Sequence, residues 1–137
     1  MLTDFNKAFN VPINRKPTLL NKNEFNLRYN LLLEEINEYK DACEEKDLVK
    51  VSDAIIDVAY VLYGAVVSHG LEKVFYDMFE EVHKSNMSKL ENGKVLKRSD
   101  GKVMKGSEYF KPNLKQFLDE WYIINRNHVP TQGVKWQ

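Results

Sequence analysis

The hydrophobic and polar positions of this chain follow the period of an α-helix over most of its length. From about Asn23 to Glu45 apolar residues recur at every third or fourth position, which indicates a helix with one buried face. These apolar residues are Leu27, Leu31, Leu32, Ile36, Tyr39, Ala42 and Cys43. A second helix is expected to begin after the N-cap residue Asp47, to be apolar nearly all round, and to run to about His69 before Gly70. The two helices should form an antiparallel hairpin that turns near residues 45 and 46.

Shorter elements are predicted on both sides of this hairpin. A short amphipathic helix carrying Leu2, Phe5 and Phe9 should precede an irregular arm that ends near residue 21. A third long helix is expected from Leu71 to about Lys89, and a last helix over residues 113–125. The tail from 127 to 137 is expected to be loose or used in packing.

Residues 93–105 change from the helical pattern to that of a hairpin. Gly93–Lys97 and Gly101–Lys105 are predicted as two short strands around Ser99-Asp100-Gly101, because Asp-Gly is a strong turn signal. The expected fold class is therefore all-α: a helical bundle built on an antiparallel helix hairpin, with a short β-hairpin near residues 93–105. We expect a single domain over residues 1–137, in which 115–137 forms a helical extension and tail.

Composition narrows the setting and the partners. The 137 residues include one cysteine, and equal numbers of acidic and basic residues, 20 of each, give no net charge that would attract nucleic acid or anionic lipid. The longest uncharged stretch, Val58–Ser68, is shorter than the roughly 20 residues that cross a bilayer. With no apolar leader at the N-terminus, we expect a cytoplasmic protein with neither nucleic-acid nor membrane partners.

Charge is unevenly distributed along the chain. Residues 24–81 hold 14 acidic and 5 basic side chains, whereas residues 84–115 hold 9 basic and 3 acidic ones. In the first long helix the apolar arc is centred near Glu35, with Glu34 and Glu38 on its shoulder. A buried carboxylate must become neutral, pair with a cation or bind metal. Arg28, two turns before Glu35, could neutralise one of the three but not all.

The second helix repeats this anomaly. Asp53 and Asp57 are the only charged residues between Val51 and Ser68, and they share one face. An antiparallel hairpin places Glu38 near the level of Asp53, and Glu34 and Glu35 near that of Asp57. The sequence therefore predicts that these carboxylates converge as an all-oxygen site suited to Mg²⁺ or Mn²⁺. The alternative is that Glu34 and Glu38 are ordinary solvated surface acids.

Basic residues surround the predicted β-hairpin. A polyphosphate needs cationic side chains as well as metal, so this segment is a candidate phosphate site. Asn86 and Lys89 are favoured because they continue the buried face of the third helix. The alternative is a lysine-rich exposed hairpin with edges protected from aggregation. Other active sites fit less well, because Cys43 has no indicated activating partner and the Glu-x-x-His unit of di-iron bundles occurs only once, at Glu80.

These motifs together resemble the MazG-like and phosphoribosyl-ATP pyrophosphohydrolase-like superfamily of all-α nucleotide pyrophosphohydrolases. The resemblance covers about residues 2–114. It is carried by the Glu-Glu-x-x-Glu motif from Glu34 to Glu38, by the segment from Asp53 to Tyr60, and by the segments 5–9, 81–89 and 100–109. One motif departs from the family pattern. The second motif is commonly Glu-x-x-Asp, but Ala54 stands three residues before Asp57, so the number of metal ions stays open and Asp53 is the candidate replacement.

The resemblance implies a Mg²⁺-dependent hydrolase that cleaves a nucleoside triphosphate between the α and β phosphates, as a homodimer or homotetramer. It implies metal binding by Glu34, Glu35, Glu38, Asp53 and Asp57, with Glu34 the candidate base for the attacking water. Candidate substrate contacts are Lys89, Lys102 and Lys105 for phosphates, Asn86 for sugar or phosphate, Phe5, Phe9 or Tyr109 for the base, and Arg28. Two alternatives remain: a module that binds metal-nucleotide without hydrolysis, and a metal-free helical interaction protein.

Overall fold

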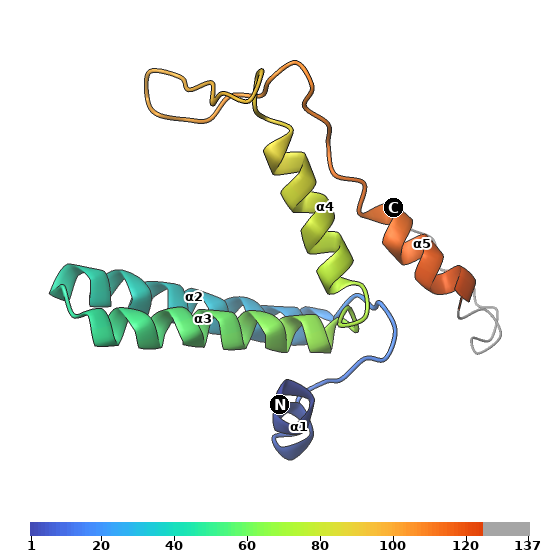
Figure 1. Ribbon diagram of the computed structural model, residues 1–137. Coiled ribbons are helices and arrows are strands. Elements are labelled where there is room, and N and C mark those ends of the chain that lie inside the picture. The colour runs from blue at the N-terminus through green and yellow to red at the C-terminus, as the bar shows by residue number, and fades with distance from the viewer. Residues whose placement is uncertain (125–137) are drawn as a thin grey trace. The chain divides into compact units, whose positions relative to one another are not determined.

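The computed structural model describes residues 1–124 and shows five α-helices in that part of the chain (Figure 1). They are α1 (Leu2–Ala8), α2 (Lys22–Glu45), α3 (Leu48–Ser68), α4 (Phe75–Met87) and α5 (Lys115–Ile124). No β-strand occurs within these residues, so the all-α class is confirmed. The helices divide between two compact units, Met1–Lys73 and Val74–Gln137. The predicted tail at 127–137 lies outside the described residues.

The α2–α3 hairpin is delimited by side chains that satisfy the free backbone groups at the helix ends. Asn21 accepts hydrogen bonds from the backbone N–H of Asn23 and Glu24, and the Glu24 carboxylate accepts one from the Asn21 N–H, which completes a capping box. Lys46 ends α2 in the left-handed conformation at φ 58°. Asp47 then caps α3 by accepting from the N–H groups that follow it. The predicted turn and both helix boundaries are thereby confirmed to within one residue.

The arm between α1 and α2 is held on the C-terminal end of α3. The Ser68 hydroxyl and the Asn6 amide both donate to the Pro12 carbonyl, at 3.1 and 3.2 Å, and the Asn14 amide donates to the Ser68 carbonyl at 2.7 Å. Ser68 and Asn6 are each only 1% exposed. A side chain at Gly70 would place its Cβ 2.2 Å from a backbone oxygen of the arm, so the arm approaches α3 more closely than any other residue type would allow.

A large apolar surface of the hairpin remains exposed in the single chain. The face of α2 that the sequence predicts to be buried is only partly so: Ala42 is buried, but Leu27, Ile36, Tyr39 and Cys43 are exposed. The prediction of one buried face is therefore wrong for four of these seven apolar residues, because α3 is the helix against which α2 mainly packs. On α3, Leu48, Val49 and Ile56 are exposed as well.

By length and composition, α3 is the one helix in residues 1–124 that could span a membrane. A helix of this kind also fits a soluble protein when a neighbouring helix or subunit covers it. Asp53 and Asp57 interrupt its apolar surface.

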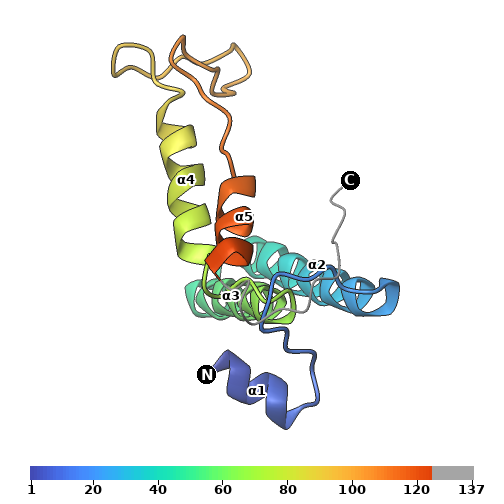
Figure 2. The same cartoon turned by 90° about the vertical axis from the view of Figure 1, so that its right-hand side faces the viewer.

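The second unit begins with a shorter helix than the sequence pattern predicts. α4 starts at Phe75, four residues after the predicted start at Leu71. Gly70 adopts φ +67° and the Leu71 N–H donates back to the Val66 carbonyl, so the chain makes a turn before the next helix can begin. The apolar residues of this turn share the helical spacing of α4, which is why periodicity alone assigns them to the helix. α5 lies beside the first part of α4 (Figure 2).

The loop after α4 contains the predicted turn but no strands. Lys97 and Val103 form an isolated antiparallel bridge, and the Met104 N–H donates to the Leu96 carbonyl. A second, tighter turn joins Glu91 and Lys94 through two backbone hydrogen bonds of 2.9 Å. Neither turn has more than one bridged pair of residues, so the predicted β-hairpin is reduced to a hairpin-like loop.

Candidate functional site

A contact between α2 and α3 provides a check on the register of the hairpin. A Cβ added at Gly64 would lie 3.2 Å from Nη1 of Arg28, so the Arg28 side chain crosses directly onto the α3 backbone. Arg28 precedes Glu35 by seven residues, and Gly64 follows Asp57 by seven. Since both helices rise about 1.5 Å per residue, the same register places Glu35 at the level of Asp57. The convergence predicted from the turn length therefore agrees with a contact two helical turns away.

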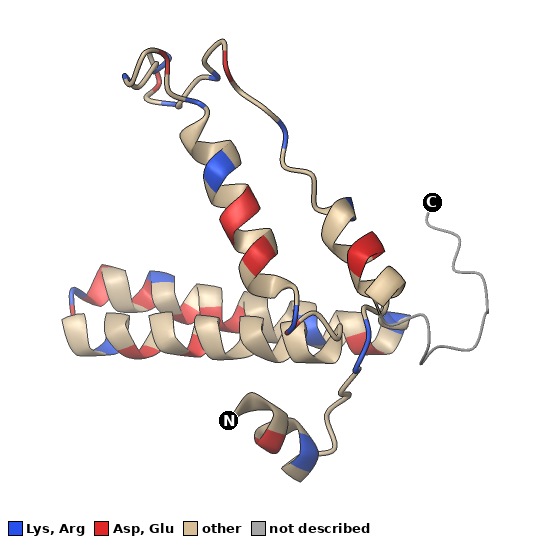
Figure 3. Cartoon of the chain, turned by 45° about the vertical axis from the view of Figure 1, so that its right-hand side comes forward, with Lys and Arg blue, Asp and Glu red and all other residues tan. Residues whose placement is uncertain are grey.

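Electrostatics within the hairpin join the five acidic candidates into one group. Desolvation raises the pKa of the Glu35 carboxyl, and the charges of Asp57, Glu38, Glu34 and Asp53 raise it further, in that order. Asp57 has the largest effect among the four carboxylates, as expected from its position opposite Glu35. Figure 3 shows acidic segments on both helices of the hairpin. A divalent cation would relieve this repulsion, so the chemistry of the donor set fits Mg²⁺ or Mn²⁺.

The five carboxylates differ in exposure. Glu35 and Asp57 are half-buried, whereas Glu34, Glu38 and Asp53 are exposed. Within residues 1–124, no group of three or more His, Cys, Asp or Glu side chains is arranged closely enough to hold a metal ion. The helices bring these residues to one region of the hairpin, and ligation would require their side chains to rotate towards one another.

Arg28 does not neutralise this acidic group. Its guanidinium makes no ion pair or hydrogen bond with any residue between Met1 and Ile124. The side chain is half-buried, and desolvation lowers the pKa of the guanidinium. Arg28 lies two helical turns before Glu35 on α2. This separation explains why the neutralisation of one glutamate by Arg28, which the sequence suggested, does not occur.

A cluster of aromatic rings joins α1 to α3 in the same unit. Phe5 and Phe9 of α1 stack with their ring centroids 4.4 Å apart, and Phe5 meets the ring of Tyr60 edge-on at 5.5 Å. Tyr60 follows Asp57 by less than one turn of α3. Phe9 is 66% exposed, so one face of the stack remains accessible. The structure thus brings two of the predicted base-stacking residues close to the helix that carries Asp57.

The remaining candidates belong to the second unit. The Lys89 ammonium donates a hydrogen bond of 2.7 Å to the Asn86 amide oxygen, so these two residues lie together at the end of α4. Lys105 sits over the ring of Tyr109, with its ammonium 4.3 Å from the ring centroid. The contact between Lys105 and Tyr109 makes each of them less available to a ligand. The sequence did not indicate this contact.

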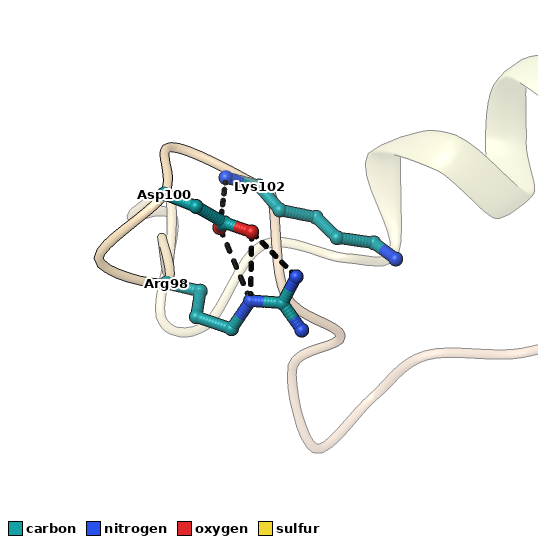
Figure 4. A network of polar contacts seen from close by, with 3 residues as sticks. All are labelled: Arg98, Asp100 and Lys102. Atoms are coloured by element: carbon teal, nitrogen blue, oxygen red, sulfur yellow. Dashed lines mark hydrogen bonds and ion pairs between the residues drawn. The ribbon is translucent and has the colours of Figure 1, made fainter.

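Figure 4 shows the tip of the loop, where Asp100 is engaged by Arg98 and by the backbone N–H of Lys102. The Arg98 guanidinium, followed by that N–H, holds the pKa of the Asp100 carboxyl below its ordinary value. Asp100 therefore belongs to the turn, and the Lys102 ammonium has no carboxylate partner among the described residues.

Sequence reasoning missed a cleft of about 280 Å³ in the second unit. Acidic side chains of α4 and α5 line it, namely Asp77, Glu80, Glu81 and Glu120, together with Lys84. Lys84 pairs with Glu80, and the Glu81 carboxylate accepts a hydrogen bond from the backbone N–H of Asn113. None of the predicted site residues lines this cleft, and two of its acidic residues already have partners in the fold.

Comparison with known proteins gives this arrangement a family. The model of the phosphoribosyl-ATP pyrophosphohydrolase family matches residues 2–86, more than half of the 137-residue chain. The matched part includes α1, the α2–α3 hairpin with its five carboxylates, and nearly all of α4. A search of curated protein sequences found no match. The chain therefore belongs to the phosphoribosyl-ATP pyrophosphohydrolase family, a family of pyrophosphohydrolases.

Proposed function

We propose that this protein hydrolyses a nucleoside triphosphate or deoxynucleoside triphosphate between the α and β phosphates, with Mg²⁺ or Mn²⁺ held by the hairpin. The products would be a nucleoside monophosphate and pyrophosphate. The observation that carries this proposal is that the pyrophosphohydrolase family model covers the α2–α3 hairpin, on which Glu35 and four further carboxylates lie close enough to influence one another. A divalent cation would relieve the repulsion within this acidic group.

The proposed metal ligands are Glu34, Glu35, Glu38, Asp53 and Asp57. These residues would hold a divalent ion, which would supply positive charge to offset that of the phosphates and would acidify a water molecule. Glu35 and Asp57, which face one another and are half-buried, would form the inner part of the site. Glu34 is exposed and lies beside Glu35 in the sequence, so we propose that it is the base that accepts the proton of the attacking water.

Further substrate contacts are proposed for each unit taken by itself. In the first, the exposed face of the Phe5–Phe9 stack offers a surface for a base. In the second, Asn86 and Lys89 act as a hydrogen-bonded pair on phosphate or sugar, and Lys102 offers an ammonium that has no carboxylate partner in residues 1–124. Lys105 and Tyr109 would serve together, since the ammonium already rests on the ring.

We also propose that the protein is a homodimer or homotetramer. The exposed apolar side chains of α2 and α3 form a surface that a second copy of the hairpin would cover, with Ile36, Ile55 and Leu62 among them. Such an assembly would explain an apolar α3 without a membrane, consistent with a cytoplasmic protein acting on free nucleotides. Sedimentation equilibrium should give at least twice the monomer mass, and a monomer would refute this part.

The activity is tested with a panel of canonical and modified nucleoside triphosphates, their deoxy forms and phosphoribosyl-ATP, in the presence of Mg²⁺ or Mn²⁺. Pyrophosphate and monophosphate should appear in equal amounts from at least one triphosphate. Turnover should be lost in the double variant Glu35→Gln with Glu38→Gln and retained in Glu44→Gln, whose carboxylate pairs with Lys40 on the surface. Cleavage of phosphoribosyl-ATP alone, or turnover that survives the double substitution, would refute the proposal.

A further inference from the structure

Arg28 is a charged residue without a counterpart in the first unit. The residue is half-buried and its Nη1 lies against Gly64 of α3, and the guanidinium has no ion pair or hydrogen bond with any residue described by the structure. Arginine carries five N–H donors in a rigid plane, and leaving them unsatisfied in a partly desolvated place destabilises the fold. A purely structural arginine would be expected to find a carboxylate or carbonyl, and several carboxylates are present on the same hairpin.

Gly64 gives this guanidinium its place. A Cβ at position 64 would approach Nη1 of Arg28 to 3.2 Å, so an alanine would force the guanidinium to shift. Gly64 lies inside a long helix, where glycine costs roughly 1 kcal/mol relative to alanine. The backbone conformation does not require it, since Gly64 is not among the glycines with positive φ. The glycine therefore serves to leave room beside α3 for the Arg28 side chain.

Arg28 lies on the same face of α2 as Glu35, the central residue of the acidic group. It lies two helical turns from Glu35, roughly 10.5 Å along the axis. This separation is too great for a direct ion pair, yet both residues share one face of the hairpin. A ligand that carries a divalent cation at one point and further negative charge beyond it would satisfy both. A polyphosphate or nucleotide phosphate bound through metal has this pattern of charge, and guanidinium groups bind phosphate with two parallel hydrogen bonds.

We propose that Arg28 binds a phosphate group of the substrate outside the reach of the metal ligands, and that Gly64 keeps the space for it. The proposal rests on the proposed function for the identity of the ligand. The phosphate has two possible sources: the chain that leaves as pyrophosphate, or the phosphate that stays on the nucleoside. Arg28 is on this view a substrate-binding residue and takes no part in proton transfer.

The test measures binding of the two products, which undergo no further turnover, by calorimetry in the presence of Mg²⁺. Pyrophosphate represents the leaving chain, and adenosine monophosphate represents the phosphate on the nucleoside. Arg28→Met keeps most of the apolar stem and removes the charge, and it should weaken binding of at least one probe by about 10-fold or more, as expected for a lost charge-assisted hydrogen bond. Arg28→Lys should recover part of this loss. Lys22→Met, which removes an exposed charge from the same helix, is the matched control and should bind like the wild type.

Thermal melting without phosphate separates binding from folding. Arg28→Met should melt at the wild-type temperature or higher, because it removes an unpaired, half-buried charge. Gly64→Ala should not lower the melting temperature either, since alanine favours the helix, but it should weaken binding of the same probe as Arg28→Met. Opposite changes in stability and binding are not expected of a residue whose role is only to pack.

The outcomes distinguish this proposal from the proposed function. Weakened binding of pyrophosphate alone, or of adenosine monophosphate alone, identifies which phosphate Arg28 contacts. Weakened binding of both indicates that Arg28 lies near the bond that joins these two parts of the substrate. Wild-type affinity for both probes in Arg28→Met, or no binding of either probe by the wild type, overturns the proposal. If the wild type hydrolyses triphosphates but Arg28→Met binds like the wild type, the function stands and the Arg28 site fails. If Arg28 governs binding but no triphosphate is hydrolysed, the site stands and the enzymatic function fails.

Discussion

Replacing Glu35 by glutamine tests the acidic site through stability, without any assumption about the substrate. The substitution keeps the size of the side chain and removes one charge from the middle of the group. In the metal-free protein the ionised carboxylate is unfavourable, because desolvation and four neighbouring carboxylates raise its pKa. Without metal, Glu35→Gln should therefore unfold at the wild-type temperature or above it.

Mg²⁺ should reverse this order. At a concentration 100 times its dissociation constant, an ion that binds only the folded state stabilises it by about 2.7 kcal/mol. For a chain of this length each kcal/mol changes the melting temperature by roughly 3–5 °C, so Mg²⁺ should raise that of the wild type by roughly 8–13 °C. Glu35→Gln should lose most of this increase, whereas Glu44→Gln, with its carboxylate paired to Lys40, should keep it.

The dependence on pH gives an independent check. A carboxyl whose pKa is higher in the folded state favours folding when it is protonated. That contribution is fully present below the ordinary pKa of 4.5 and is lost as the pH rises through the higher folded value. The stability of the metal-free wild type relative to Glu35→Gln should therefore be highest at low pH and should fall as the pH rises above 4.5. Calorimetric melting across pH 4–8 measures it. An unchanged Mg²⁺ effect in Glu35→Gln, or a variant destabilised equally with and without metal, would refute the reasoning.

Three further substitutions test the framework that positions the site. Gly70→Ala should destabilise the first unit by about 2 kcal/mol or more, because it combines a left-handed conformation with a Cβ 2.2 Å from a backbone oxygen of the arm. Gly93→Ala is the control: Gly93 also has a positive φ but lies in open space, so this substitution should cost only the conformational strain. Asp47→Ala should cost about 1 kcal/mol by removing the cap of α3, measured by urea unfolding. Ser68→Ala should cost about 1 kcal/mol by removing its hydrogen bond to the Pro12 carbonyl, and no change in urea unfolding would show that the arm is not held there.

The hairpin could be predicted from the sequence because its signals are local. Asp47 is a cap residue in front of an apolar run, and the number of residues on each side of the turn sets which positions face one another. The opposition of Glu35 and Asp57 follows from that count and agrees with the Arg28–Gly64 contact. Local caps and a constant helical rise carry enough information to align two helices.

Other features depend on interactions that periodicity does not encode. The start of α4 was placed too early because the residues after Gly70 keep helical spacing while the chain turns back on α3. The exposure of Ile36 and Tyr39 could not be foreseen either, since an apolar face indicates that something covers it but not which molecule does so. The engagement of Lys105 by Tyr109 depends on loop geometry, which spacing along the chain does not determine.

The charges of the hairpin are arranged in a way that a folded protein alone has little reason to maintain. Five carboxylates gather around Glu35 and repel one another, while the half-buried cation on the same face, Arg28, stands two turns away and pairs with none of them among the described residues. Shifting Arg28 by one turn towards Glu35 would relieve both costs at once. That the sequence keeps them apart, with a glycine reserved beside the arginine, fits a ligand that presents a cation to the acidic residues and an anion to Arg28. A metal-bound phosphate ester meets this requirement, and an inert helical scaffold does not.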